Sequence, residues 1–290
     1  MVPMSAADGP GRVPSWREVL AFSRRAEGAG LDSVWVCDHL LSDDPDRPDD
    51  PPEGIHEAWT VLAALAATTE RLELGQLVMC ASFRNPGLLA KMAATADSIC
   101  GGRLILGVGS GWYDPEYEAF GYPTDHKVSR LEESLQILAP LLRGEQVSFE
   151  GRYHRSHQAS LLPHPERPIP LLIAAEGPRM LRLTARHADA WCTAWYGAPD
   201  DALRRRLAEM TSALQAEDRD PTTLRRTVGV GVAGPGGAQD PGTVSGSVDD
   251  LARALDGYTE LGFDDVIVGL GPPSAAMLDH LAEARLRQGH

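Results

Sequence analysis

The feature that most constrains the fold of this chain is a regular alternation of short apolar segments with longer amphipathic ones. Seven apolar segments have the length and composition of buried strands, and helical periodicity separates them. The predicted strands cover residues 33–37, 72–79, 104–108, 171–175, 189–194, 226–233 and 265–270. Because strands that alternate with helices form parallel βαβ units, seven or eight units predict a closed TIM (β/α)8 barrel. A doubly wound parallel sheet is the alternative.

Start signals support the predicted helices. Ser15 and Glu18 have the spacing of a capping box, and Asn85 followed by Pro86 is a favourable helix start. The predicted helices cover residues 15–28, 58–68, 86–99, 130–142, 178–187, 199–215, 248–261 and 274–286. Between the fourth and fifth strand positions, residues 144–170 form an irregular insertion with a small hairpin at 146–153. We therefore expect one domain over residues 1–290.

No convincing strand is predicted for the first strand position of the barrel. An eighth strand would precede the helix that starts at Ser15, but residues 1–14 are mostly glycine, proline and small residues. Either Met1-Val2-Pro3-Met4 is a stub of that strand, or the chain as given begins late. We therefore expect a barrel whose first strand is degenerate or missing.

Charge and cysteine content exclude several classes of function. The chain has 27 Lys and Arg against 41 Asp and Glu, a net charge of −14, whereas nucleic acids and anionic membranes bind basic faces. Its 4 cysteines lack C-x-x-C spacing and its histidines lack metal-ligand spacing, so we expect no metal. No apolar run approaches the roughly 18 residues of a membrane span. We expect a cytoplasmic protein that acts on small molecules.

Functional side chains of a (β/α)8 barrel follow the carboxyl ends of its strands. Asp38 and His39 follow one strand, and the His39 imidazole could carry a proton near neutral pH. Glycines after another strand would bring the backbone close to a ligand. The turn at residues 175–178 opens a helix whose free amides could hold a phosphate. Besides Asp38 and His39, the candidates are Met79, Cys80, Gly109, Ser110, Gly111, Trp112, Ala175, Glu176, Gly177 and Pro178.

The glycine-rich stretch at residues 104–111 also has a competing interpretation, the turn of an S-adenosylmethionine methyltransferase. That turn would lie on the first strand of its domain, with an acidic strand end about 20 residues later. Here three βα elements precede the stretch, and residues 127–133 have a helical pattern. We therefore interpret the stretch as one wall of a barrel mouth.

Three blocks of sequence form a specific set. They are D-S-V-W-V-C-D-H at 32–39, R-N-P at 84–86 with G-R-L at 102–104 and G-S-G-W at 109–112, and G-P-R with A-R-H-A-D at 177–189. Over about residues 15–270 this set resembles the bacterial luciferase-like family of flavin- and deazaflavin-dependent oxidoreductases. The similarity is greatest to the subgroup described as F420-dependent.

The resemblance implies a barrel with an insertion, usually a homodimer, that binds FMN or the deazaflavin coenzyme F420. By position, Asp38 and His39 would lie beside the isoalloxazine ring, and Met79-Cys80 would form a bulge behind it. Residues 109–112 would border the cofactor, and residues 175–178 would hold its phosphate. The sugar-phosphate dehydrogenases of the family have a glutamate at the position of Trp112, and its absence counts against that activity.

The leading hypothesis is hydride transfer between F420 and a small organic substrate, with His39 and Asp38 at the reacting centre. An FMN-dependent monooxygenase is the alternative, and a non-catalytic flavin-binding barrel is a third possibility. The substrate is not identified, because the loops at 42–54 and 144–170 carry no recognisable motif.

Overall fold

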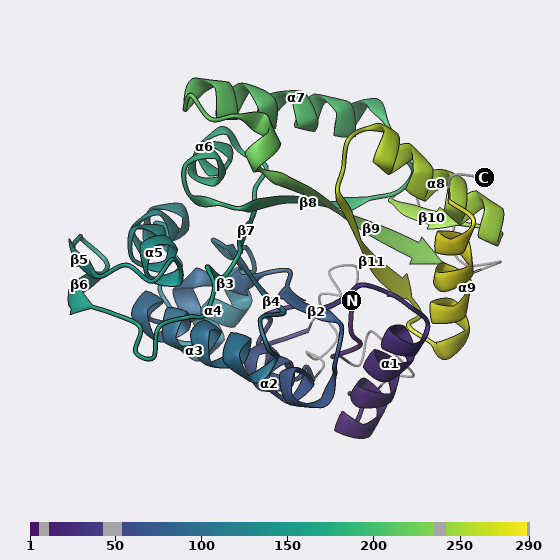
Figure 1. The fold of residues 1–290 in the computed structure, drawn as a ribbon, viewed down its shortest axis with the longest axis horizontal. Coiled ribbons are helices and arrows are strands. Elements are labelled where there is room, and N and C mark those ends of the chain that lie inside the picture. The colour runs from purple at the N-terminus through teal and green to yellow at the C-terminus, as the bar shows by residue number, and fades with distance from the viewer. Residues whose placement is uncertain (6–11, 43–53, 235–241, 289–290) are drawn as a thin grey trace.

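The computed structural model describes residues 1–5, 12–42, 54–234 and 242–288. Helices surround a curved sheet of parallel strands, and the N-terminus lies near the middle of the ring (Figure 1). In spatial order the strands are β1 (Ser33–Val36), β2 (Glu73–Gln76), β4 (Leu104–Gly109), β7 (Leu171–Ala174), β8 (Ala190–Tyr196), β9 (Arg225–Ala233) and β11 (Asp265–Gly271). The predicted parallel α/β architecture is therefore confirmed.

The outer layer consists of helices that return the chain from one strand to the next. They are α1 (Trp16–Gly28), α2 (Ala58–Thr68), α3 (Pro86–Ile99), α5 (Lys127–Leu142), α6 (Pro178–His187), α7 (Asp201–Ala216), α8 (Val248–Glu260) and α9 (Ala275–Leu286). The hydrogen bonds expected from the start signals are present at the N-termini of α1 and α3. Ser15 N donates to the Glu18 carboxylate at 2.8 Å, and Asn85 Oδ1 accepts from Gly87 N at 2.9 Å.

Residues 1–4 close the barrel between β11 and β1. Val2 N donates to Trp35 O at 2.8 Å, and Met1 N donates to Val268 O at 2.5 Å. The side chains of Val2 and Met4 are buried in the core. The segment thus contacts both neighbouring strands without forming a regular ladder, which confirms the expectation of a degenerate first strand.

The predicted strand at 72–79 is wrong in one respect, because the structure contains two strands there. β2 ends at Gln76, and β3 (Met79–Cys80) pairs with β4 only after a break at Leu77 and Val78. At the break, Gly107 N donates to Gln76 Oε1 at 3.1 Å, so a side chain replaces a ladder bond. The break residues Leu77 and Val78 are themselves apolar, so the sequence pattern continues through them.

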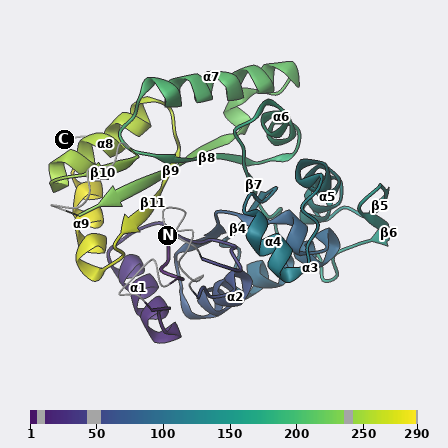
Figure 2. The same cartoon turned by 180° about the vertical axis from the view of Figure 1, so that it is seen from behind.

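Four short elements were not expected: α4 (Asp114–Phe120), β10 (Thr243–Ser245), η1 (Ala81–Phe83) and η2 (Pro221–Thr223). The insertion contains the antiparallel hairpin of β5 (Val147–Glu150) and β6 (Arg155–Ala159), which stands beside α5 and apart from the barrel (Figure 2). Glu133 on α5 accepts hydrogen bonds from the backbone of Arg152, Tyr153 and His154 at 2.9, 2.7 and 2.9 Å. This carboxylate holds the hairpin against the helix.

The barrel interior contains a small cluster of buried side chains, formed by Trp35, Ile105, Leu172, Ala190, Cys192 and Ile267. A Cβ at Gly75 would lie 2.3 Å from the Trp35 ring, so this ring uses the space that the glycine leaves. Within the part of the chain that the structure describes, no helix is long and apolar enough to cross a membrane.

Candidate functional site

The carboxyl ends of the strands surround a cavity of about 810 Å³, a size typical of sites for cofactors and small substrates. Its lining includes residues 1–3 and the ends of β1, β4, β7, β8, β9 and β11. The structure brings ten of the twelve predicted site residues to this cavity: Asp38, His39, Cys80, Gly109, Ser110, Gly111, Trp112, Ala175, Glu176 and Gly177.

The two other predicted residues lie outside the lining. The Met79 side chain is fully buried in the hydrophobic core, and Leu77 and Val78 line the cavity in its place. Pro178 begins α6 and faces a separate hollow of about 790 Å³ between α6 and α7. The difference at Met79 follows from the break after β2, which changes which side chains face the barrel mouth.

Several lining residues were missed from the sequence. They are Met1, Val2, Pro3, Cys37, Leu77, Val78, Glu116, Ala174, Met180, Cys192, Thr193, Ala194, Gly231, Gly269, Leu270 and Pro273. Six of them, on β8, β9 and β11, lie within the strands, so a search of the last residues of these strands and not only of the residues after them was needed. Glu116 instead lies on α4, where Asp114-Pro115 is a helix-start signal that could have located it.

Glu116 contacts the histidine that the sequence singles out. Its carboxylate lies 3.3 Å from His39 Nδ1 and accepts a hydrogen bond from Leu40 N at 2.8 Å. Glu116 is 2% exposed, so α4 places this carboxyl group beneath the imidazole. Glu116 engages Nδ1, and among the described residues no hydrogen bond is found at Nε2, so Nε2 would be the ring nitrogen that exchanges a proton with a ligand.

Asp38 is bound on both carboxylate oxygens. Oδ2 accepts from Arg84 Nη1 at 2.6 Å and from Cys80 N at 2.9 Å, and Oδ1 accepts from Arg84 Nη2 at 3.0 Å. Burial raises the pKa of Asp38, and Arg84 and the Cys80 amide oppose that shift. Arg84 also contacts Glu57, the N-cap of α2, at 2.6 Å. Asp38 therefore ties the end of β1 to β3 and α2.

A hydrogen-bonded pair supports the backbone after β4. Tyr117 OH lies 2.8 Å from Cys80 Sγ and donates to Ser110 O at 3.0 Å. Burial raises the pKa of Cys80 to about 11, so its thiol is protonated at neutral pH. Tyr117, also on α4, thus connects β3 with the turn that borders the cavity.

The glycines after β4 serve packing as well as ligand access. A Cβ at Gly109 would lie 2.6 Å from Val78 Cγ2, and a Cβ at Gly111 would lie 1.9 Å from the Tyr117 oxygen. Gly111 also has a φ of +77°, which favours glycine. The expectation that these glycines bring backbone close to a ligand is therefore incomplete, because neighbouring side chains occupy the space.

The first turn of α6 is suited to an anion. Gly177 is its N-cap without a side-chain cap, and Pro178 lacks an N–H, so the amides of Arg179 and Met180 have no acceptor within the helix. Gly177 and Met180 line the cavity, and a Cβ at Gly177 would meet no atom within 4 Å. Arg206 Nη1 donates to Glu176 O at 2.5 Å and orients this turn.

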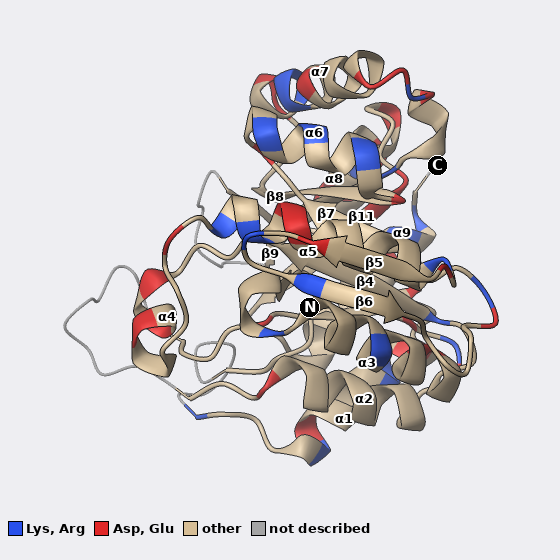
Figure 3. Ribbon diagram, turned by 90° about the vertical axis from the view of Figure 1, so that its left-hand side faces the viewer, with Lys and Arg blue, Asp and Glu red and all other residues tan. Residues whose placement is uncertain are grey.

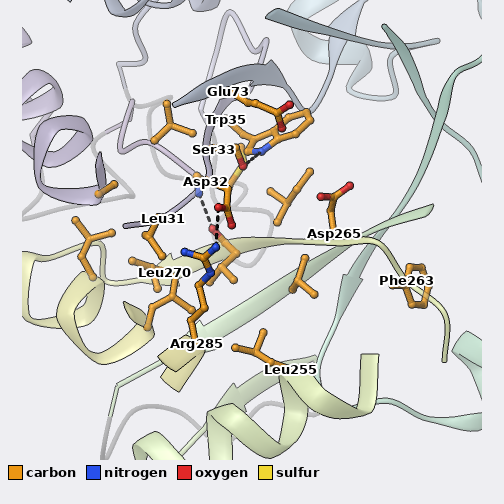
Figure 4. Close-up of a pocket in the computed structure, with 18 of the residues that line it drawn as sticks. Leu31, Asp32, Ser33, Trp35, Glu73, Leu255, Phe263, Asp265, Leu270 and Arg285 are labelled. Atoms are coloured by element: carbon orange, nitrogen blue, oxygen red, sulfur yellow. Dashed lines mark hydrogen bonds and ion pairs between the residues drawn. The ribbon is translucent and has the colours of Figure 1, made fainter. Parts of the chain in front are cut away.

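A smaller hollow of about 230 Å³ lies at the opposite end of the barrel, between β1, β11 and helices α1, α8 and α9 (Figure 4). Its charged side chains pair with one another. Arg285 Nη2 lies 2.6 Å from Asp32 Oδ1, and Arg225 Nη2 lies 2.5 Å from Asp265 Oδ1. Among the described residues, no group of three or more His, Cys, Asp or Glu side chains is placed to hold a metal ion. The larger cavity is therefore the candidate site.

Comparison with known proteins supplies independent information. Residues 2–234 match the family described as luciferase-like monooxygenase. The F420-dependent glucose-6-phosphate dehydrogenase of Amycolatopsis mediterranei (strain U-32) is 37% identical over 217 residues, 71% of this chain and 63% of the relative. The enzyme of the same description from Kineococcus radiotolerans is 34% identical over 212 residues, 71% of this chain and 61% of the relative. The chain thus matches about three fifths of the length of these relatives.

Solved structures agree with the architecture. An F420-dependent secondary alcohol dehydrogenase in complex with an F420–acetone adduct superposes with a TM-score of 0.79 at 18% identity, covering 93% of this chain and 94% of that one. The EDTA monooxygenase EmoA of Chelativorans sp. BNC1 gives a TM-score of 0.78 at 16% identity, covering 99% and 91%. These likenesses confirm the predicted barrel fold.

Proposed function

Because this chain belongs to the luciferase-like monooxygenase family, we propose that it is an oxidoreductase that transfers a hydride between coenzyme F420 and a small organic substrate. The observation that carries the proposal is the contact of His39 with the buried Glu116 in a cavity that also reaches the first turn of α6. The curated relatives described as F420-dependent support F420 as the hydride carrier.

The residues of the cavity fit a cofactor that combines a flat ring with a phosphate. The amides of Arg179 and Met180, with the open space at Gly177, would hold the phosphate. Leu77 and Val78 would provide an apolar surface for the ring. When bound, F420 supplies a ring carbon that accepts or donates a hydride.

The protein itself handles the proton. His39 Nε2 would exchange a proton with a substrate oxygen, while Glu116 orients the imidazole through Nδ1. Apolar residues of the lining, among them Leu77, Val78 and Leu270, would exclude water from the reacting atoms. Asp38 would act as a positioning residue, because Arg84 and Cys80 already occupy its oxygens.

A reduced-FMN monooxygenase is the second candidate function. A relative by fold, the EDTA monooxygenase, superposes over 99% of this chain, and the same phosphate and ring surfaces would accept FMN. The two functions differ in their use of oxygen, which F420 chemistry does not normally require. Oxygen consumption with reduced FMN therefore distinguishes them.

We further propose a homodimer in the cytoplasm. α2 carries no charged residue, and in Figure 3 its ribbon shows neither acidic nor basic colour. On the neighbouring α3, Leu88 and Ile99 are 55% and 51% exposed, and these two apolar side chains would contact a second copy. Cys37, Cys80, Cys100 and Cys192 form no disulfide, as expected in a reducing compartment. Sedimentation of Leu88→Glu/Ile99→Glu beside the unchanged protein tests the interface, and identical dimer fractions would contradict it.

Titration of the purified protein with F420 and with FMN tests the proposed function. We expect saturable quenching of F420 fluorescence and at least tenfold weaker binding of FMN. Tighter FMN binding together with oxygen consumption would favour the monooxygenase. Binding of F420 without turnover of any alcohol or carbonyl compound would favour a non-catalytic barrel.

A further inference from the structure

The charges around the cavity restrict the class of substrate, provided that the proposed function holds. The described lining contains the carboxylates of Asp38, Glu116 and Glu176, and it contains no lysine or arginine side chain. The nitrogen of Met1, which also lines the cavity, donates to Val268 O. Within the described part of the chain, the cavity lining therefore offers an anionic substrate no basic side chain to balance its charge.

Three arginines that adjoin residues of this cavity's lining are engaged by other groups. Arg84 binds Asp38 and Glu57. Arg206 donates to Glu176 O and lies 2.7 Å from Glu209. Arg179, in the first turn of α6, donates to Ser129 Oγ at 3.0 Å and pairs with Glu132. Turning one of these side chains toward a substrate would break an existing ion pair or hydrogen bond.

The remaining anion-binding element is the first turn of α6, which the phosphate of the cofactor would occupy. A second phosphate would compete for the same amides of Arg179 and Met180. An unpaired anion placed elsewhere in the cavity would lose hydration without compensation. The net charge of −14 adds an unfavourable field for any anion that approaches.

The other surfaces of the cavity suit an uncharged ligand. Leu77, Val78 and Leu270 line its wall, and Trp112 and Trp195 line it with 68% and 49% of their surface exposed. Exposed indole rings beside a cavity offer large, flat apolar surfaces for a ligand. The Trp112 ring centroid lies 5.6 Å from that of His39, so a ligand held by this indole would lie near the proton-exchanging group.

We propose that the substrate is an uncharged, largely apolar alcohol or carbonyl compound, and that sugar phosphates are excluded. In the direction of oxidation, the carbinol carbon gives its hydrogen with two electrons to oxidised F420. The hydroxyl proton passes to His39 Nε2, and the product is the carbonyl compound. The reverse reaction takes the hydride from reduced F420 and the proton from His39. This substrate class differs from the one in the description of the curated relatives.

The test uses two probes of similar shape, neutral 1-phenylethanol and anionic 4-(1-hydroxyethyl)benzoate, together with glucose 6-phosphate. F420 binding is measured first, because its failure contradicts the proposed function and not the substrate class alone. Calorimetry on the F420-loaded protein then gives the Kd of each probe. We expect the neutral probe to bind at least tenfold more tightly than either anion. Equal or tighter binding of an anion, or no binding of the neutral probe at millimolar concentration, would overturn the proposal.

A variant with an added positive charge tests whether the charge of the cavity selects the substrate. Trp112→Arg adds a cation at the cavity. It should change the ratio of the Kd values of 1-phenylethanol and the benzoate at least fivefold in favour of the benzoate, and this change should be smaller at high salt. Trp16→Arg is the matched control, because Trp16 is an exposed residue of α1 outside the cavity lining. If Trp112→Arg does not fold, as judged by circular dichroism, Trp195→Arg replaces it. An unchanged ratio in a folded, F420-binding variant would show that cavity charge does not select the substrate.

Discussion

The carboxylate of Glu116 lies 3.3 Å from Nδ1 of His39, although 77 positions separate the two residues in the chain. The contact joins the end of β1 to α4, the helix that follows β4. It gives the imidazole a fixed orientation at the cavity and a buried carboxyl partner at Nδ1. This relationship leads to the first two predictions.

Replacing Glu116 by glutamine should lower kcat about ten- to hundredfold, since the amide keeps the size of the side chain but removes the charge beneath His39. The Kd for F420 should change less than threefold. Steady-state kinetics and fluorescence titration measure the two effects. Glu118→Gln, an exposed position on the same helix, is the control and should behave as the unchanged protein. Equal kcat values for the two variants would argue against a role for Glu116.

His39→Ala should lower kcat by about two to four powers of ten, because the group that exchanges the proton is lost. F420 should still bind, as the phosphate and ring surfaces do not depend on the imidazole. Single-turnover absorbance of the cofactor separates the chemical step from binding. Turnover at the rate of the unchanged protein would remove His39 from the reaction.

Asp38→Asn should lower the free energy of unfolding by about 3 kcal/mol, because it leaves Arg84 partly buried without its main partner. Urea denaturation measures this loss. Asp32→Asn is the control: Asp32 pairs with Arg285 but its side chain is 71% exposed, so the loss should be below about 1 kcal/mol. If Asp38→Asn instead kept full stability and lost kcat, Asp38 would be a catalytic residue.

Gly177→Asp should weaken F420 binding at least tenfold, since its carboxylate would occupy the open space beside the first turn of α6 and repel a phosphate. Fluorescence titration of F420 gives the Kd. Gly28→Asp is the matched control, because a Cβ there also meets no atom within 4 Å and Gly28 lies outside the cavity lining. Similar Kd values for both variants would place the phosphate elsewhere.

Glu133→Gln should destabilise the protein by about 1 kcal/mol at pH 7, because a neutral amide is a weaker acceptor for the three backbone amides of the hairpin. These hydrogen bonds outweigh partial burial and lower the pKa of Glu133 below its ordinary value. A lowered folded-state pKa adds stability above the unfolded pKa, and this is lost as the pH falls through the folded value. The difference between the two proteins should therefore shrink below about pH 4 in urea denaturation. A constant difference from pH 7 to pH 3 would contradict this account.

The sequence by itself determined the order of the main strands and helices and ten of the residues that line the cavity. Periodicity and capping are local properties, so helices such as 58–68 and 86–99 were predicted with the bounds that the structure has. Asp38, His39 and residues 109–112 were found because parallel strands present their carboxyl ends on one side.

Only the tertiary structure decided which groups meet. Packing between elements brings His39 to Glu116 and Asp38 to Arg84. The break after β2 places Leu77 and Val78, and not Met79, in the cavity lining. The absence of a basic side chain from the described lining likewise depends on where each arginine finds its partner. Such contacts join residues far apart in the chain, and local preferences do not encode them, because packing between elements sets their geometry.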